Sequence, residues 1–334
     1  MSKIKLGIIG AGRITQVVHL PILSKMSEVE IDSICDVDQT IVKAVGDKYN
    51  IKNKFTDYEK LLKREDITAV NICTSTSTHK EIAIAAIEAG KDVFIEKPAA
   101  IDYKSTLEIA EFSKLKKKKV MVGMNSRFRP DVMLLKSIIE NKELGKIYYV
   151  KTGWLRKLNQ DFIKDKNNKY HSDGALLDMG IVMLDLALWM TGFPNIERVN
   201  AINYFQPNKS KEHTSVIFLG MKNGATYSIE VSEGLFVEKE LYYCNIYGEN
   251  GHGKINPIHV MKEIQGTVMN VTPSKYSGTE NIFYRSYEIE LKHFIGAVKK
   301  IHPLISSIEE AVLRMNIIDA VIKSSKKGKE IIFK

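Results

Sequence analysis

Cysteine is scarce in this sequence, since a chain of 334 residues contains only three. Cys35, Cys73 and Cys244 lie far apart, and their spacing fits neither a disulfide framework nor a zinc site. The histidines show no metal-ligand spacing either. We therefore expect a protein of a reducing compartment, the cytoplasm, with no metal.

Long hydrophobic runs are absent as well. No uncharged apolar stretch reaches the roughly 18 residues that would predict a membrane span. The first predicted strand begins at residue 3, which leaves no room for a signal peptide before it. No membrane partner is expected.

Arginine is the third scarce residue type, with eight among the 49 basic residues. The formal net charge of +9 therefore comes almost wholly from lysines, which are scattered along the chain. The densest run, KLKKKK at 114–119, ends a helical pattern and precedes the apolar VMVG. This position favours a solvated helix end over a nucleic-acid patch, and no nucleic-acid partner is expected.

Short β-rich runs alternate with helical patterns in the first third of the chain. The predicted strands are 3–9, 30–35, 54–55, 69–74, 92–96 and 119–125. Such alternation predicts a parallel sheet with helices on both faces. We assign residues 1–122 to a doubly wound Rossmann domain of the α/β class.

The pattern changes in residues 123–334, which we assign to a second α/β domain. A helix at 130–142 precedes a strand-like segment, a polar loop and a second helix. Strands with Gly or Asn-Gly turns then dominate 196–272 and predict an antiparallel sheet. Two amphipathic helices, at 283–300 and 307–327, close the chain.

A glycine-rich loop, GIIGAGRI, follows the first predicted strand and opens a helix. Gly10 and Gly12 allow a tight turn and a close approach to a pyrophosphate, which the helix amino terminus stabilises. Arg13 and Ile14 continue this loop, and Thr15 takes the place of a third glycine. The loop predicts a dinucleotide site, the alternative being a Rossmann-like domain without nucleotide.

Asp36 ends the second predicted strand, where a carboxylate can accept hydrogen bonds from the adenosine ribose hydroxyls. No Arg or Lys follows it immediately, and the sequence Asp-Val-Asp would repel a 2′-phosphate. The expected cofactor is therefore NAD, with NADP disfavoured.

The segment DVFIEKPAA places Glu96, Lys97 and Pro98 at the carboxyl end of the fifth predicted strand. In open α/β sheets the ligand crevice lies at that edge. An ammonium group there can bind a substrate oxygen or transfer a proton. The alternative is an ordinary surface lysine after a strand.

Several segments together resemble the Gfo/Idh/MocA oxidoreductases. They are GIIGAGRI, CDVD, TSTSTHKEIAIAAIEAGKDVFIEKPAAID, VGMNSRFRP, GALLDMGIVMLD and the carboxyl-terminal SIEEAVLRMNIIDAVIKSSKKGKEI. The resemblance covers essentially the whole chain, and the Glu-Lys-Pro element is its most specific part. It implies an NAD-binding Rossmann domain followed by an α/β domain with a large, open sheet, often used for contacts in a homodimer or homotetramer.

The resemblance also implies hydride transfer between nicotinamide and a carbinol or ketone of a sugar, cyclitol or sugar nucleotide. Lys97 would then contact both nicotinamide and substrate, and Glu96 would belong to the cofactor site. The loop after the fourth strand would contact the cofactor. Its matching residues are Thr74, Ser75, Thr76 and His79, with Ser75 and Thr76 where the family usually has Pro and Asn.

The helix signature of the family is Asp-x-Gly-x-His-x-x-Asp, and this chain lacks its histidine. Asp178, Gly180 and Asp185 match, whereas Val182 occupies the histidine position. A histidine there would lie on the face that the two acids share and would transfer the proton of the carbinol oxygen. Valine cannot do so.

Three groups are candidates to replace that histidine: Lys97 alone, Tyr170 or His171, of which the last two lie in the polar loop before the helix. Asp178 is expected to orient a substrate hydroxyl, and its alternative is an acid stabilised by the helix dipole. The deeper Asp185 is expected to be structural.

Two further residues are candidates for substrate binding. Arg127 follows the sixth predicted strand, where it can bind a substrate anion or tie the domains together. Trp154 lies on the first strand of the second domain, where it can stack on a sugar ring or pack in the core.

The leading hypothesis is an NAD-dependent dehydrogenase or ketoreductase acting on a small polyhydroxylated substrate. A non-catalytic NAD-binding sensor is a second possibility, which the loss at Val182 favours. A third is a redox-neutral elimination or glycosidase reaction assisted by tightly bound NAD. Retention of Lys97 and Asp178 favours chemistry over sensing.

Overall fold

The computed structural model describes residues 3–157, 174–207, 210–273 and 281–333. Contacts divide the chain into two compact units, each built from two segments. Unit 1 comprises Met1–Phe128 and Asn281–Met315, and unit 2 comprises Arg129–Glu280 and Asn316–Lys334. The division after Phe128 lies close to the boundary expected at 122/123, whereas the return of Asn281–Met315 to unit 1 had no counterpart in the sequence prediction.

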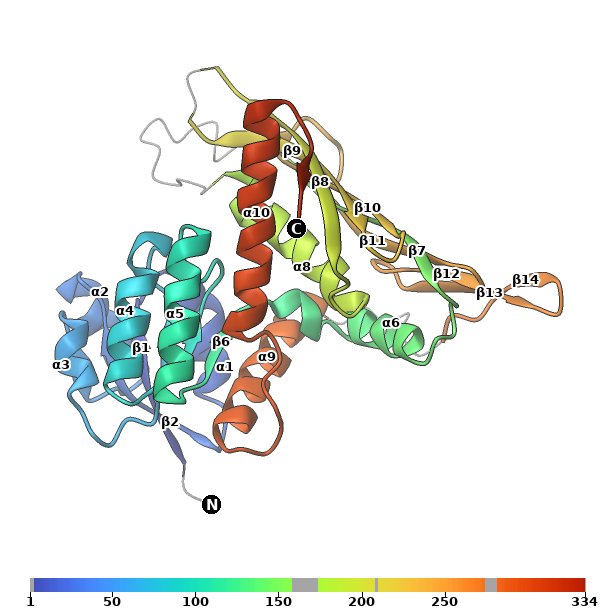
Figure 1. Cartoon of the computed structure of the whole chain (residues 1–334). Helices are drawn as coiled ribbons and strands as arrows, with labels where there is room; N and C mark the ends of the chain where they lie inside the picture. Colours follow the sequence, from blue (N-terminus) through green and yellow to red (C-terminus); the bar gives the residue numbers. More distant parts are fainter. Residues whose placement is uncertain (1–2, 158–173, 208–209, 274–280, 334) are drawn as a thin grey trace. The chain divides into compact units, whose positions relative to one another are not determined.

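Unit 1 contains a six-stranded parallel sheet in the order β3-β2-β1-β4-β5-β6 (Figure 1). Its strands are β1 Ile4–Ile9, β2 Val29–Cys35, β3 Asn53–Phe55, β4 Ala69–Ile72, β5 Asp92–Ile95 and β6 Val120–Val122. The order reverses between β1 and β4, which is the switch point where doubly wound sheets bind their ligands. All six strands were predicted from the sequence.

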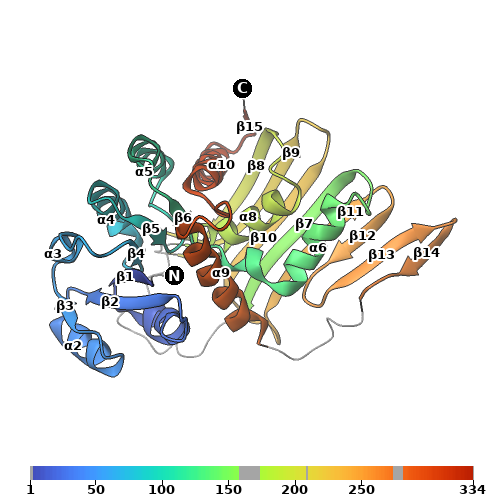
Figure 2. The same cartoon turned by 90° about the horizontal axis from the view of Figure 1, so that it is seen from below.

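Helices cover both faces of this sheet (Figure 2). One face carries α3 Tyr58–Leu62, α4 Thr76–Glu88 and α5 Tyr103–Lys116, which contact one another in sequence order. The other face carries η1 Thr15–His19, α1 Leu20–Leu23, α2 Gln39–Lys48 and α9 Ile282–Val298, which share one apolar core with the sheet. The unit is therefore a doubly wound domain, as predicted.

Helix α9 comes from the carboxyl-terminal part of the chain and completes the second layer of unit 1. Its Leu291 and Phe294 are buried against Phe94 of β5 and Met121 of β6. The rings of Phe94 and Phe294 meet edge to face at 5.6 Å. Fully burying such side chains contributes roughly 1.5–3 kcal/mol each, enough to hold the helix on the sheet.

Unit 2 contains a nine-stranded mixed sheet in the order β14-β13-β12-β11-β7-β10-β9-β8-β15. The strands are β7 Ile147–Lys157, β8 Ile196–Phe205, β9 Glu212–Met221, β10 Thr226–Leu235, β11 Leu241–Gly248, β12 Gly251–Lys254, β13 His259–Ile264, β14 Thr267–Asn270 and β15 Ile331–Ile332. Among the described strands of this sheet, β7 and β10 pair in parallel and all other neighbours pair antiparallel. The large, open, mainly antiparallel sheet is confirmed.

The helices of unit 2 lie on one face of this sheet (Figures 1 and 2). They are α6 Pro130–Glu140, η3 Leu176–Gly180, α8 Ile181–Met190 and the end of α10 Ile308–Lys327. Helix α8 is buried on nearly all sides and contacts β7, β10 and β11. On the other face, apolar side chains such as Ile202 and Phe218 are exposed.

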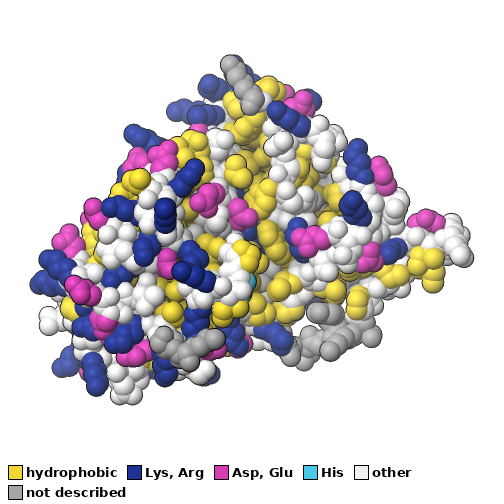
Figure 3. Space-filling view, turned by 60° about the horizontal axis from the view of Figure 1, so that its bottom comes forward, with side chains coloured by type: hydrophobic (Ala, Val, Ile, Leu, Met, Phe, Trp, Pro, Cys, Tyr) yellow, Lys and Arg dark blue, Asp and Glu magenta, His cyan; other side chains and the backbone are white. Residues whose placement is uncertain are grey.

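Basic and acidic side chains alternate on the face of the molecule drawn in Figure 3, without gathering into one basic patch. No helix among the described residues is long and apolar enough to cross a membrane.

Candidate active site

The glycine-rich loop makes a turn that only glycine tolerates. Gly10 has a φ of +95°, and a Cβ atom there would lie 2.5 Å from the carbonyl oxygen of Cys73 and 2.8 Å from the nitrogen of Thr74. The loop after β1 therefore packs directly on the loop after β4. The hydroxyl of Thr15 donates to the Gly10 carbonyl at 2.7 Å, so the residue in the third glycine position holds the loop closed.

The surroundings of Gly12 fit a pyrophosphate, because a Cβ atom there would meet nothing within 4 Å. Arg13 is exposed and Ile14 half-buried at the start of the helix that runs on into η1. Asp36 is half-buried, and its carboxylate accepts the N–H of Ala11 at 2.7 Å and that of Asp38 at 3.0 Å. A carboxylate has about four acceptor positions, so two remain for ribose hydroxyls.

The loop after β4 is held by a buried histidine. The His79 ring lies between two main-chain carbonyl oxygens, with Nδ1 2.8 Å from that of Pro98 and Nε2 3.0 Å from that of Thr74. His79 thus joins the loop after β4 to the turn after β5. Ser75 is exposed and Thr74 and Thr76 are half-exposed, which leaves them accessible to a ligand, whereas His79 supports the loop from within.

Lys97 lies two residues after the end of β5 and is half-buried. Its main-chain N–H donates to Oε2 of Glu96 at 3.2 Å, and its peptide bond to Pro98 is cis. Gly10 packs the loop after β1 on the loop after β4, and His79 joins the loop after β4 to the turn after β5. The ends of β1, β4 and β5 thus lie side by side at the switch point of the sheet. The structure therefore brings Gly10, Thr74 and Lys97 together along the edge where the sequence predicted a cofactor site.

A buried ion pair behind Lys97 was not predicted from the sequence. Nε2 of His19, which is fully buried on η1, lies 2.9 Å from Oε1 of Glu96. Nothing in the apolar segment VVHL distinguishes this histidine from an ordinary core residue, and the two partners are 77 positions apart.

Arg127 has surroundings that differ from those expected of a substrate ligand. Its side chain is fully buried in unit 1, and Nη1 donates to Oε2 of Glu310 on α10 at 2.7 Å. Because a buried guanidinium requires such a partner, Arg127 stabilises the return of the carboxyl-terminal segment to unit 1.

In unit 2, Asp178 on η3 forms an ion pair with a residue of β7. Residues alternate along a strand, so Trp154 and Arg156 lie on the same face of β7 as the buried Thr152, the face that α8 covers. Nη1 of Arg156 lies 2.9 Å from Oδ2 of Asp178, and about a quarter of each side chain is exposed. Arg156 was not singled out from the sequence, because nothing in its spacing marks it as the partner of an acid 22 residues away.

The other acid of the helix and the valine between them are buried. Asp185 is fully buried on α8, in accord with the structural role expected for it, and 5% of Val182 is exposed. Tyr170 and His171, the two candidates from the preceding loop, lie outside the described residues.

Trp154 is half-exposed, and its indole Nε1 donates to Glu240 at 2.5 Å. The ring of Tyr242 meets it edge to face at 5.4 Å, and the Arg156 guanidinium lies 5.0 Å from its centroid. The indole is thus held in one orientation beside Arg156. This arrangement is compatible both with a ring that stacks on a ligand and with a side chain that packs against its neighbours.

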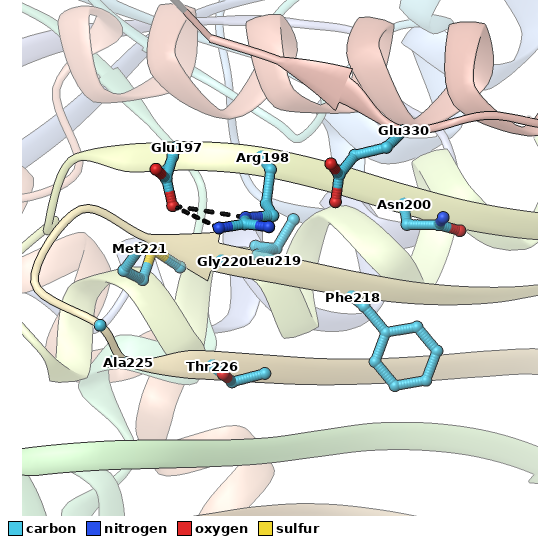
Figure 4. Close-up of a pocket in the computed structure, with 11 residues that line it drawn as sticks. Glu197, Arg198, Asn200, Phe218, Leu219, Gly220, Met221, Ala225, Thr226 and Glu330 are labelled. Atoms are coloured by element: carbon cyan, nitrogen blue, oxygen red, sulfur yellow. Dashed lines mark hydrogen bonds and ion pairs between the residues drawn. The ribbon is translucent and has the colours of Figure 1, made fainter.

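The pocket drawn in Figure 4 lies elsewhere in unit 2, among β8, β9, β10 and Glu330. It contains the Glu197–Arg198 ion pair and the ring of Phe218, and none of the predicted site residues lines it. Among the residues that the structure describes, no group of three or more His, Cys, Asp or Glu side chains is placed to hold a metal ion.

Unit 1 has the strand order, the glycine turn and the acid after β2 that define a dinucleotide-binding Rossmann domain. The model of an oxidoreductase family with an NAD-binding Rossmann fold, Gfo/Idh/MocA, matches residues 4–124, and the model of its C-terminal α/β domain matches residues 136–332. The chain belongs to the Gfo/Idh/MocA family of oxidoreductases.

Its similarity to characterised members extends over nearly its full length. D-glucoside 3-dehydrogenase of Escherichia coli strain K12 is 25% identical over 350 residues, covering 99% of this chain and 97% of the relative. Myo-inositol 2-dehydrogenase of Thermotoga maritima is 26% identical over 339 residues, covering 98% of each. The structure of levoglucosan dehydrogenase with NADH and levoglucosan superposes with a TM-score of 0.86 at 21% identity, covering 99% of both chains, which shows a common fold.

Proposed function

We propose that this oxidoreductase is an NAD-dependent dehydrogenase or ketoreductase whose substrate is a small polyhydroxylated ring compound, a sugar, cyclitol or sugar nucleotide. The observation that carries the proposal is the joined row of strand ends in unit 1. Gly10, the loop at Thr74 and Lys97 meet at the switch point, where a doubly wound sheet binds its ligand.

The cofactor site follows from the same residues. The open space at Gly12 admits a pyrophosphate, and the remaining acceptor positions of Asp36 suit the two ribose hydroxyls of NAD. A 2′-phosphate would meet the Asp36 carboxylate and be repelled, which favours NAD over NADP. When bound, NAD supplies the acceptor for a hydride at nicotinamide C4, and NADH supplies the hydride in the reverse direction.

Lys97 is the proposed proton-transfer residue. In the oxidation, the carbinol C–H bond would break with transfer of its hydride to the acceptor that NAD supplies. The Lys97 side chain, in its neutral amine form, would take the hydroxyl proton and become an ammonium as the carbon–oxygen double bond forms. In the reduction, Lys97 returns that proton to the oxygen. The Glu96 carboxylate accepts the main-chain N–H of Lys97, and His79 contacts the carbonyl of Pro98, so the fold sets the position of Lys97.

In unit 2, Asp178 is proposed to accept a hydrogen bond from a substrate hydroxyl. Its ion pair with Arg156 restricts the orientation of the carboxylate, and about a quarter of the Asp178 side chain is exposed. Trp154 beside this pair is proposed to stack on the apolar face of the ring.

The substrate class rests on the relatives. The names of the two dehydrogenases and the levoglucosan complex describe proteins that act on or bind rings with several hydroxyl groups. Carboxylate, guanidinium and indole side chains, as found around Asp178, are groups that recognise such rings by hydrogen bonding and stacking.

The proposal is tested by mixing purified protein and NAD+ with a panel of inositols, glucosides, anhydrosugars and sugar nucleotides while following NADH absorbance. Lys97→Ala is expected to lower kcat by about 10²–10⁴-fold, the usual contribution of a proton-transfer residue, with NADH still bound. Lys104→Ala, which removes an exposed lysine from α5, is the matched control and should leave kcat unchanged. Full activity of Lys97→Ala would overturn the site assignment.

The loop before η3 is tested in the same assay. Tyr170→Phe and His171→Ala ask whether either residue replaces the absent histidine. Unchanged rates in both variants would leave Lys97 as the proton-transfer residue.

The sensor alternative is favoured by one observation, the buried Val182 at the position of the family histidine. A sensor would bind NADH tightly and turn over no member of the panel. Turnover of any polyol that depends on Lys97 excludes this alternative.

A further inference from the structure

Polar side chains gather on one face of the Rossmann sheet, directly behind Lys97. Strand alternation turns Phe94 and, two residues on, Glu96 toward the layer formed by η1 and α9. On the neighbouring strand β4, Asn71 and Cys73 turn to the same side. His19 reaches into this group from η1, in an otherwise apolar core.

The His19 ring contacts a polar partner on each nitrogen. Nε2 lies 2.9 Å from Oε1 of Glu96, and Nδ1 lies 2.8 Å from the side-chain amide of Asn71. Sγ of Cys73 is 3.6 Å from Nδ1 and 3.0 Å from the Asn71 amide oxygen. The ring therefore bridges the ends of β4 and β5, and the second oxygen of Glu96 accepts the main-chain N–H of Lys97 at 3.2 Å.

The hydrogen bonds of this group assign its protons. The side-chain nitrogen of Asn71 can only donate, so Nδ1 of His19 accepts its hydrogen bond and the ring proton lies on Nε2. Burial by itself raises the pKa of Glu96, but the hydrogen bond of His19 acts against burial and lowers it. The Nε2–H of His19 therefore donates to the Glu96 carboxylate.

Helix α9 brings two further titratable groups to the cluster. Tyr287 lies 6.0 Å from the His19 ring, and the carboxyl of Glu290 accepts the N–H of Met124 at 2.5 Å. Burial, followed by the charge of Glu96, raises the pKa of Glu290 well above its usual range. The charge of Glu96 thus disfavours a second carboxylate at Glu290, and Glu96 depends on the His19 N–H for its buried hydrogen bond.

We propose that His19 is a positioning residue of this enzyme: its ring holds the Glu96 carboxylate against the main-chain N–H of Lys97 and thereby fixes Lys97 for proton transfer. The proposal rests on the proposed role of Lys97. Without the Nε2–H donor, a nearly buried carboxylate would have to rotate toward water or take up a proton, and either change weakens its hold on the Lys97 N–H.

The first test measures hydrogen exchange at single amides, which requires no turnover. His19→Leu is expected to raise the exchange rate of the Lys97 amide by about tenfold, the effect of weakening one hydrogen bond. The Glu96 amide, which donates to the Ile72 carbonyl at 3.0 Å, is the internal reference and should change little. An unchanged Lys97 amide, or equal loss of protection at both amides, would overturn the proposal.

His19→Gln provides a second variant, which keeps an N–H donor for Glu96 in a side chain of similar length. If His19 acts through its hydrogen bond to Glu96, the glutamine amide replaces it in part. Protection of the Lys97 amide should therefore lie closer to that of the natural protein in His19→Gln than in His19→Leu. Equal loss of protection in both variants would contradict the proposal.

The second test is a kinetic cycle in which Lys97→Ala, His19→Leu and the double variant are compared. If His19 acts through Lys97, its loss matters only while Lys97 is present. In the natural background, His19→Leu should therefore lower kcat about 10–100-fold, because Lys97 is misplaced. In the Lys97→Ala background, the same change should lower kcat less than twofold. The KM for substrate and the Kd for NADH should stay within about threefold, because neither ligand contacts His19 in the proposal. Equal losses of kcat in both backgrounds would overturn it.

Ile22→Val is the matched control, since it removes one methyl group from the same buried helical segment without touching the cluster. It should lower thermal stability slightly, by about 0.5–1.5 kcal/mol, and leave the Lys97 amide and kcat unchanged. If the natural protein turns over no polyol, the proposed function fails, and the exchange measurements still decide whether His19 fixes Lys97.

Discussion

Arg156 and Asp178 are joined by an ion pair of 2.9 Å that connects the end of β7 to the helix carrying the family signature. Both side chains remain about one-quarter exposed. Asp178 is thus oriented by a strand residue 22 positions away.

The proposed role of Asp178 predicts a loss in substrate binding. Asp178→Asn should raise the KM for a polyol so that kcat/KM falls about 10–100-fold, the effect of losing a charged hydrogen bond. Arg156→Ala should act in the same direction, and the double variant should be little worse than either single one. Initial-rate kinetics at varied substrate provide the measurement.

Arg198→Ala is the control for Arg156→Ala. It removes another arginine of unit 2 that pairs with a neighbouring acid, Glu197, but on the open face of the sheet. Its KM should equal that of the natural protein. An equal rise of KM in both arginine variants would mean that the effect is not local to Asp178.

Asp36 predicts the cofactor preference. Asp36→Asn removes the charge that repels a 2′-phosphate and weakens the acceptor for the ribose hydroxyls, so the preference for NADH over NADPH should fall about 10–100-fold. Fluorescence titration with each cofactor measures both dissociation constants. Asp38→Asn makes the same change of charge two residues away, where the side chain caps α2, and should leave the preference within about threefold because asparagine also caps well.

Local patterns in the sequence predicted much of the fold and of the cofactor edge. Strand and helix periodicity located the six strands of unit 1, and Gly10 with Asp36 marked the cofactor edge because glycine turns and strand-terminal acids are local signals. The return of α9 to unit 1 had no local signal, because its apolar face fits any sheet equally well.

The pairings inside the site could not be predicted for a related reason. His19 with Glu96, Arg156 with Asp178 and Arg127 with Glu310 each join residues that only the folded sheets bring together. Arg127 shows the consequence: its place after β6 left a substrate contact and a tie between the domains equally open, and its burial beside Glu310 depended on an unpredicted helix position.

Glu290 predicts an unusual dependence of stability on pH. Its pKa in the folded protein is raised above the ordinary 4.5, so the folded state binds the proton more tightly than the unfolded state. Stability from this group is therefore complete below about 4.5 and is lost as the pH rises toward the folded pKa. Glu290→Gln, which keeps an acceptor for Met124, should melt at a higher temperature than the natural protein at pH 8 and at a more similar one at pH 5.

The comparison requires a control from the same helix. Glu288→Gln removes an exposed carboxyl paired with Lys292 and should change the melting temperature little at either pH. A lower melting temperature of Glu290→Gln at pH 8 would show that the Glu290 carboxylate is ionised and stabilising in the folded protein.

The open face of the large sheet predicts self-association. Ile202 and Phe218 are 72% and 49% exposed on that face, an arrangement that favours burial against a second copy of the sheet. Light scattering should give two or four times the chain mass of 37.8 kDa, and Phe218→Glu should reduce it. Leu115→Glu places the same charge on an exposed apolar residue of α5 and should not change the mass.

Val182 allows a direct test of whether this helix still needs its histidine. Val182→His introduces an imidazole one turn after Asp178 at a site that is 5% exposed, so a loss of about 1–3 kcal/mol from overpacking is expected. If Lys97 carries the proton in the natural enzyme, kcat should change less than about threefold and no new ionisation near the ordinary histidine pKa should enter its pH profile. A large gain in kcat together with such an ionisation would instead show that the natural chain lacks an efficient proton donor. If the natural protein binds NADH without turning over any substrate and Val182→His gains turnover, the natural chain is identified as a sensor. The missing chemistry would then be explained by Val182, the one side chain that separates the chain from the family signature.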